Sequence, residues 1–99
     1  MLRHIVAWNL MAGFTDEENK ATAQKIKSEL EGLANCVEGI VKLKVYTDMI
    51  GSSNRHVVLD SVFESEAALE AYQVHPEHQR VAAFVRSVTE ERACVDFWE

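Results

Sequence analysis

Two histidines and a tyrosine lie close together in the segment Tyr72-Gln-Val-His75-Pro-Glu-His78. A histidine in an apolar pocket favours its neutral form, because removal from water penalises the charged ring. It can then accept a proton near neutral pH, while a neighbouring tyrosine hydroxyl donates a hydrogen bond to a developing enolate or oxyanion. Such a pair suits proton abstraction next to a carbonyl group, as in an aldol-type cyclisation.

A third candidate, His4, lies on the predicted first strand, on the same face as Val6 and Trp8. If that face meets the helices, His4, Tyr72 and His78 converge in one pocket. We therefore predict His78, Tyr72 and His4 as the catalytic residues. The residues predicted to bind the substrate are the apolar Val6, Trp8, Val81 and Val85.

These residues also have purely structural interpretations. Tyr72 and His78 can be core-edge side chains with satisfied hydrogen bonds. His75 precedes Pro76, where a helix is expected to begin, so its side chain is expected to cap that helix. The spacing His75-x-x-His78 is compatible with a metal site, but no third ligand is evident, so we predict no metal and no cofactor. His56 is expected to be a solvated residue at the rim of the sheet.

Two acidic residues, Asp60 and Asp96, fall within predicted strands. An acid in a strand is either paired or faces a wet cavity. Asp60 can orient a histidine, or it can pair with Arg3 or Arg92. The same two interpretations apply to Asp96.

The composition predicts one small acidic globular domain over residues 1–99. The chain carries 10 basic and 16 acidic side chains, which gives a net charge of −6 and argues against binding to nucleic acid or to an anionic membrane. No segment approaches the roughly 20 apolar residues needed to span a bilayer. Cys36 and Cys94 fit free thiols in a reducing cytoplasm, where we expect the protein. With no His or Lys near either cysteine in sequence, neither is predicted as a nucleophile.

The elements that position these residues follow from hydrophobic periodicity and capping signals. Thr15 and Glu18 form a capping box, Ser65 caps a short helix, and Pro76 opens another helix. The predicted strands are residues 2–11, 37–47, 55–63 and 92–98. The first predicted helix begins after Thr15 and ends near residues 32–35. Two further helices are predicted over residues 66–73 and 76–88. The order β-α-β-β-α-β is that of an α+β, ferredoxin-like protomer with a four-stranded antiparallel sheet.

The first and third predicted strands are apolar on both faces, although two helices can cover only one face of a four-stranded sheet. Ile5 and Ala7 point opposite to Val6 and Trp8. We therefore predict a homodimer through the second sheet face, in which two sheets form an α/β barrel. The alternative is a monomer whose second face is semi-apolar.

Four segments spread over the whole chain carry a family resemblance. They are Arg3-His4-Ile5-Val6-Ala7-Trp8, then Phe63-Glu64-Ser65, then Tyr72-x-x-His75-Pro76-x-His78 with Val81 and Phe84, and finally Asp96-Phe97. These segments resemble the Dabb family, the stress-responsive dimeric A/B barrel proteins. The resemblance implies a ferredoxin-like protomer and a homodimer whose sheets pack into a barrel, in agreement with the strand patterning.

One enzymatic branch of that family, the plant polyketide cyclases, is similar to this chain at the key positions. This similarity implies that Tyr72 and His78 form a hydrogen-bonding and basic pair, with His4 lining the pocket. Some plant members hold a magnesium ion through backbone carbonyls after the first helix, a region that corresponds to residues 33–37. Backbone ligands leave no side-chain signature, so magnesium is not carried over to this chain.

The expected function is that of a small homodimer that binds a hydrophobic or aromatic carbonyl compound and catalyses cofactor-free proton transfer or cyclisation. A first alternative is a non-enzymatic ligand-binding or stress-protective dimer, which predicts a filled or absent pocket. A second alternative comes from the wider dimeric α/β-barrel group. It is a cofactor-free monooxygenase or a haem-handling protein.

Overall fold

The strands and helices of the chain follow the predicted order in a computed structural model, which describes residues 1–99. The strands are β1 (Leu2–Leu10), β2 (Ile40–Tyr46), β3 (Val57–Phe63) and β4 (Thr89–Trp98). The helices are α1 (Asp16–Gly32), the short 3-10 turn η1 (Leu33–Asn35), α2 (Glu66–Val74) and α3 (Pro76–Val88). The predicted ferredoxin-like α+β fold is thereby confirmed.

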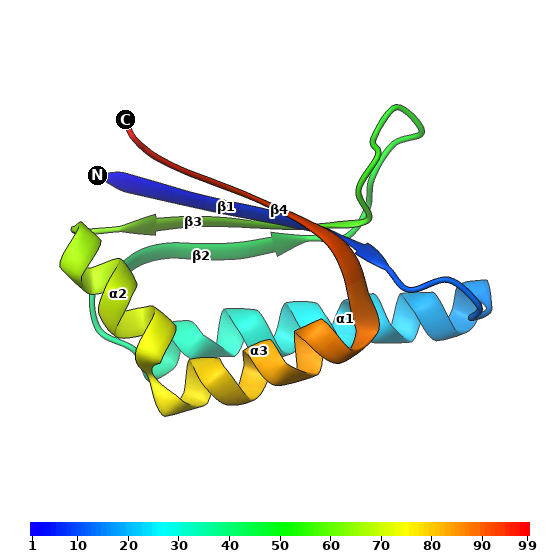
Figure 1. The fold of residues 1–99 in the computed structure, drawn as a ribbon, viewed down its shortest axis with the longest axis horizontal. Coiled ribbons are helices and arrows are strands. Elements are labelled where there is room, and N and C mark those ends of the chain that lie inside the picture. The colour runs from blue at the N-terminus through cyan, green and yellow to red at the C-terminus, as the bar shows by residue number, and fades with distance from the viewer.

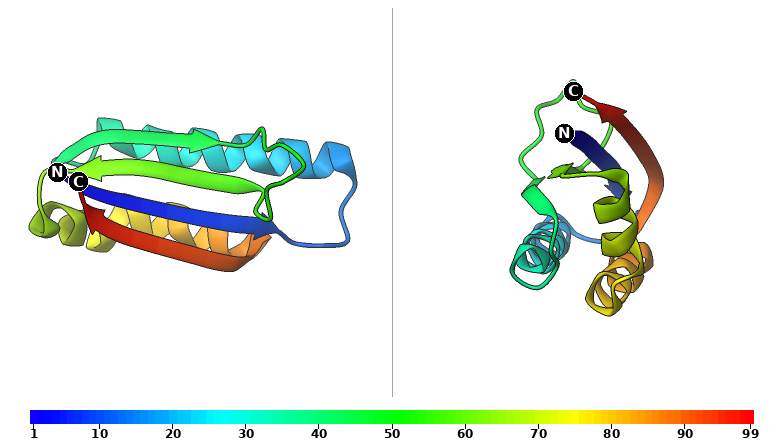
Figure 2. Two further views of the ribbon diagram at one scale, coloured as in Figure 1. Left: turned by 90° about the horizontal axis from the view of Figure 1, so that it is seen from above. Right: turned by 90° about the vertical axis from the view of Figure 1, so that its left-hand side faces the viewer.

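The four strands form one antiparallel sheet in the order β2-β3-β1-β4. Helices α1 and α3 lie side by side against one face of this sheet, and the opposite face carries no helix (Figures 1 and 2). The two termini lie at the same end, where the Glu99 amide donates to the Met1 carbonyl. Strand β2, with its exposed lysines, lies at one edge of the sheet.

Local capping explains where the helices begin. The Thr15 hydroxyl accepts from the Glu18 amide while the Glu18 carboxylate accepts from the Thr15 amide, so the predicted capping box is present. Ser65 caps α2 by accepting from the Ala68 amide. The His75 ring nitrogen Nδ1 accepts from the Glu77 amide at the start of α3, as predicted for this residue.

Strand β4 begins three residues earlier than the predicted residue 92, directly at the end of α3. No turn segment separates the two elements. The chain direction is adjusted inside the strand instead, where Glu91 has a φ of 52° and the pairing with β1 shifts its register. The sequence contains no glycine or proline at this point, so the usual turn signal is missing.

The core lies between the sheet and the helices. Alternate residues of β1 are buried there, because successive side chains of a strand point to opposite faces. Strand β3 contributes its own alternate set, with Phe63 completely buried. The largest fully buried side chains include Tyr72, Phe63, Ile26, Leu33 and Val6.

The other side of the sheet, here called the uncovered face, presents residues from all four strands. Its apolar members include Val95 and Phe97, which are 56% and 40% exposed. The loop between β2 and β3 rises on this side, away from the helices (Figure 1), and carries Ile50, which is 75% exposed. The members of the uncovered face are Arg3, Ile5, Ala7, Lys42, Lys44, Tyr46, Val58, Asp60, Val62, Ala93, Val95 and Phe97.

Asp60 belongs to this uncovered face and pairs with Arg3 at 2.5 Å and with Lys42 at 2.8 Å. Of the two roles considered for Asp60, orientation of a histidine is therefore wrong, because the histidines of the core lie on the opposite face of the sheet. Ion pairing with Arg3 is confirmed. The pKa of the Asp60 carboxyl is lowered by its hydrogen bonds to Lys42 and Arg3, against the opposing effect of burial.

None of the helices combines the length and apolar composition required to cross a bilayer.

Candidate functional site

A cavity of about 190 Å³ lies between the sheet and helices α2 and α3, and we call it the His78 cavity. Its walls are mainly apolar, and its polar groups converge from β1, α2, α3 and β4. This combination is typical of small-molecule sites. The lining residues are His4, Val6, Trp8, Leu30, Leu59, Tyr72, His78, Ala82, Val85, Arg86 and Arg92.

His78 lies on the first turns of α3, and its ring is held by one backbone contact. Its Nδ1 lies 3.1 Å from the carbonyl oxygen of Gln73. A carbonyl only accepts, so Nδ1 carries the hydrogen, and the neutral ring has its lone pair on Nε2. Burial lowers the pKa of His78 below its ordinary 6.5, and the positive charges of Arg86 and Arg92 act in the same direction. The neutral imidazole, with one unprotonated nitrogen, therefore predominates at neutral pH.

Tyr72 lies on the last turn of α2 and is completely buried. Its hydroxyl oxygen has no hydrogen-bond partner within the chain, although a buried polar atom normally has one. The tyrosine ring packs against the His78 ring, with 4.3 Å between centroids. Burial raises the pKa of the Tyr72 hydroxyl, which remains a hydrogen-bond donor throughout the neutral range. The pair thus combines a free base with a free donor.

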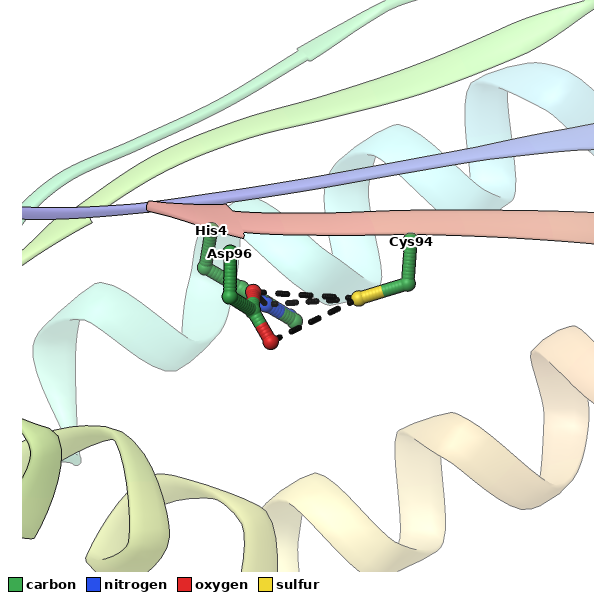
Figure 3. Close-up of side chains that lie close together, drawn as sticks. All are labelled: His4, Cys94 and Asp96. Carbon is green, nitrogen blue, oxygen red and sulfur yellow. Dashed lines mark hydrogen bonds and ion pairs between the residues drawn. The ribbon is translucent and has the colours of Figure 1, made fainter. Parts of the chain in front are cut away.

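His4 reaches the same cavity from the sheet, and Asp96 on the adjacent strand β4 fixes its orientation. His4 and Asp96 are direct partners in the register of β1 and β4, and the His4 Nδ1 contacts the Asp96 carboxylate (Figure 3). The His4 ring also stands edge-on to Phe63, at 6.1 Å between centroids. Of the two interpretations of Asp96, orientation of a histidine is the one observed, and Asp96 makes no ion pair with Arg3 or Arg92.

Cys94 is a member of this group that the sequence did not indicate. Its Sγ lies 3.9 Å from the Nδ1 of His4 and 3.7 Å from each carboxylate oxygen of Asp96. Burial and the negative charge of Asp96 raise the pKa of the Cys94 thiol, so it is protonated at neutral pH. No histidine is near Cys94 in the sequence, but strand pairing brings His4, 90 positions away, next to it.

The remaining candidates occupy other places. Of the four residues predicted to bind the substrate, Val6, Trp8 and Val85 line the cavity. The fourth, Val81, is buried in the core and is not among the lining residues. The exposed His56 lies at the far end of the sheet, where its Nδ1 accepts from the Leu10 amide. Arg86 and Arg92 also line the cavity. They were not predicted, because the sequence does not distinguish an arginine at the rim of a cavity from any other surface arginine.

The family model described as the stress-responsive A/B barrel domain, Dabb, matches residues 2–99. The chain belongs to the Dabb family. The predicted resemblance is thus confirmed over nearly the whole sequence. None of the curated proteins matches this Dabb chain.

Solved structures show the same Dabb-like arrangement. A dimeric protein of unknown function with a ferredoxin-like fold, from Bacteroides fragilis, is 28% identical, covers 97% of this chain and 93% of its own, and has a TM-score of 0.89. A Dabb family protein from Mesorhizobium loti is 22% identical, with coverage of 99% and 95% and a TM-score of 0.71. A hydroxynitrile lyase from Passiflora edulis is 17% identical, with coverage of 97% and 90% and a TM-score of 0.80. The last two, at these identities, establish the similarity of the fold alone.

Proposed function

We propose that this Dabb protein is a homodimeric, cofactor-free catalyst of proton transfer on a small carbonyl compound, bound in the His78 cavity of each protomer. One observation carries this proposal. The neutral His78 has its Nδ1 hydrogen directed at the Gln73 carbonyl, which leaves Nε2 as a base, and its ring packs against that of Tyr72, whose buried hydroxyl has no partner. A buried donor without a partner is costly unless a ligand completes it.

The cavity volume narrows the class of ligand. Dry apolar cavities of about 150 Å³ hold benzene, whereas sites for drug-sized ligands start at about 300 Å³. At about 190 Å³, the His78 cavity fits a compound with one aromatic ring and a short carbonyl side chain. A haem is much larger than this volume. A purely protective dimer is expected to have a filled pocket, so the open volume of the His78 cavity favours ligand binding instead.

The proposed step moves one proton and creates no net charge. His78 Nε2 removes the proton from the carbon next to the carbonyl, which gives an imidazolium and an enolate. The Tyr72 hydroxyl donates a hydrogen bond to the enolate oxygen, and the positive charges of Arg86 and Arg92 favour its negative charge. Return of the proton to carbon regenerates neutral His78. When the enolate carbon instead attacks a second carbonyl, the second C=O π bond opens to an alkoxide, and the imidazolium gives its proton to that alkoxide, which regenerates neutral His78.

The homodimer is proposed because the uncovered face needs a partner with the same chemistry. Val95 and Phe97 are exposed in the single chain, and an exposed apolar sheet face of this kind marks an association surface. A second copy supplies an equal apolar sheet through a two-fold axis. The Bacteroides fragilis protein, 28% identical to this chain, is described as dimeric, which supports the same assembly here.

The direct test is exchange of the methyl protons of acetophenone for deuterium in D₂O, followed by NMR. Acetophenone has one ring and exchangeable protons next to its carbonyl. We expect the wild type to accelerate exchange over buffer, His78→Ala to reduce the acceleration at least 100-fold, and Tyr72→Phe to reduce it about tenfold.

His56→Ala is the matched control, because this histidine is exposed and is not among the residues that line the cavity. It is expected to keep the wild-type exchange rate. Binding is measured separately by Trp8 fluorescence in a Trp98→Phe background, since Trp8 lines the cavity. Equal exchange rates in wild type and His78→Ala would overturn the proposal, and so would binding of acetophenone without any acceleration of exchange.

A further inference from the structure

Three side chains of different chemistry meet at the junction of β1 and β4, outside the His78–Tyr72 pair. They are His4, Cys94 and Asp96, and one ligand atom from each lies within 4.8 Å of the others. Figure 3 shows all three pointing from the sheet toward the helices. The strand pairing produces this grouping. His4 faces Asp96 directly, and Cys94 is on the same side of β4, two residues before Asp96.

We propose that His4, Cys94 and Asp96 form a three-ligand site for a zinc-class transition-metal ion, with a fourth position open to water or ligand. An imidazole nitrogen, a thiolate and a carboxylate are the donors that zinc uses, and three protein ligands with one open position are typical of accessible zinc sites. The thiolate excludes magnesium and calcium as preferred occupants, because these ions select oxygen donors.

The spacing around Cys94 already matches such an ion. Zinc bonds of about 2.3 Å to sulfur and about 2.0–2.2 Å to nitrogen or oxygen place tetrahedral ligand atoms about 3.5 Å apart. The Cys94 sulfur lies 3.9 Å from His4 Nδ1 and 3.7 Å from the Asp96 oxygens. Only the direct contact between His4 and Asp96 is too close. The Asp96 side chain is 41% exposed. A small change of its side-chain torsion moves the carboxylate about 1 Å away from the His4 ring without disturbing the core.

The site also has an entry path and a rigid anchor. His4 is buried with its side chain 4% exposed, whereas Cys94 and Asp96 are exposed, so an ion enters from the solvent side of β4 and meets a fixed imidazole. Two ligands on adjacent strands vary less in spacing than ligands on a loop. Metal at Nδ1 leaves the hydrogen on Nε2, so His4 becomes a hydrogen-bond donor at that atom.

Titration of the metal-free, reduced protein with Co²⁺ tests the site, because cobalt–thiolate bonds give a strong near-ultraviolet absorption band. We expect this band to saturate at one equivalent per chain and to disappear when Zn²⁺ is added. Cys94→Ala should abolish the band, and Asp96→Asn should weaken Co²⁺ binding at least tenfold. Cys36→Ala is the matched control. Cys36 is exposed near η1, with its thiol on the Leu33 carbonyl, and the band should persist in that variant.

Circular dichroism of each variant establishes that the fold is retained, and both mutated positions are exposed. Absence of the band in the wild type, or its survival in Cys94→Ala, would overturn the metal proposal. Tyr72→Phe should retain the band. The proton-transfer proposal is measured on metal-free protein, so each proposal can fail without the other.

Discussion

The two faces of this sheet use an aspartate in opposite ways. On the helix-covered face, Asp96 contacts a single buried histidine, His4, which lines the His78 cavity. On the uncovered face, Asp60 binds both Arg3 and Lys42 in a closed ion cluster. Both residues come from strands of one sheet and have the same side chain, so the residues on neighbouring strands determine the difference. Two cations satisfy the carboxylate of Asp60, whereas Asp96 has the imidazole of His4 as its only ion-pair partner.

This comparison shows where the fold can place chemistry. The helix-covered face has packed walls that exclude water, which strengthens polar contacts and shifts pKa values. The uncovered face has apolar side chains around its ion cluster, a surface suited to association. Four experiments test this division, in order of decreasing expected effect.

The largest effect is expected from a charge placed among the exposed apolar side chains of β4 on the uncovered face. Val95→Asp would bury a carboxylate between two sheets, which costs several kcal/mol when the charge has no partner. We expect the dissociation constant of the dimer, measured by analytical ultracentrifugation, to increase at least 100-fold. Ala21→Asp on the exposed side of α1 is the control. Equal dissociation constants for the two variants would show that this face is not the interface.

A smaller effect is expected from removal of each aspartate charge. Asp60→Asn should lower the free energy of unfolding by about 1–2 kcal/mol at pH 7, since it removes the carboxylate that Arg3 and Lys42 share and leaves Arg3 with Glu99 alone. Asp96→Asn should cost less than about 1 kcal/mol, because its side chain is more exposed and has one partner. Urea unfolding at pH 7 measures both differences. A larger loss for Asp96→Asn contradicts the comparison.

The pH dependence of the Asp60 contribution has a definite sign. The pKa of Asp60 is lowered in the folded protein from its ordinary 3.8, so the unfolded chain takes up its proton first as the pH falls. The stabilisation is complete above pH 3.8 and is lost as the pH falls through the lower, folded pKa. The difference between wild type and Asp60→Asn should therefore shrink in acid.

The smallest effect is the titration of His78. Because burial lowers its pKa below 6.5, its imidazole resonances should change in NMR only at a pH below that value. The free energy of unfolding should decline as the pH falls from about 6.5 to the folded pKa, since only the unfolded chain binds the proton in that interval. Catalysed exchange should decline through the folded pKa. A His78 that titrates above 6.5 contradicts the assignment of a neutral base.

Much of the fold could be predicted because local signals and periodicity agree. The capping box at Thr15, the proline at position 76 and the alternation in β2 each specify an element independently of tertiary structure. The pocket could be predicted in part. His4, Tyr72 and His78 lie on faces that periodicity assigns to the core, and all three line one cavity.

The cluster of His4, Cys94 and Asp96 could not be predicted in the same way. Its members are brought together by the register of β1 against β4, and register depends on the exact start of β4 and on the irregularity near Glu91. The sequence shows neither feature, since no glycine or proline marks the change from α3 to β4. A search for metal ligands by their spacing along the chain therefore stops at His75 and His78.

Strand β4 carries both sets of residues in alternation, with Cys94 and Asp96 on one side and Val95 and Phe97 on the other. In evolutionary terms, each side can change by substitution without altering the other. An insertion or deletion of one residue, in contrast, alters both sides at once. It would exchange every inward and outward side chain beyond it, and so remove the cluster and the apolar surface in a single event. Selection should therefore constrain the length of β4 more tightly than the identity of its residues.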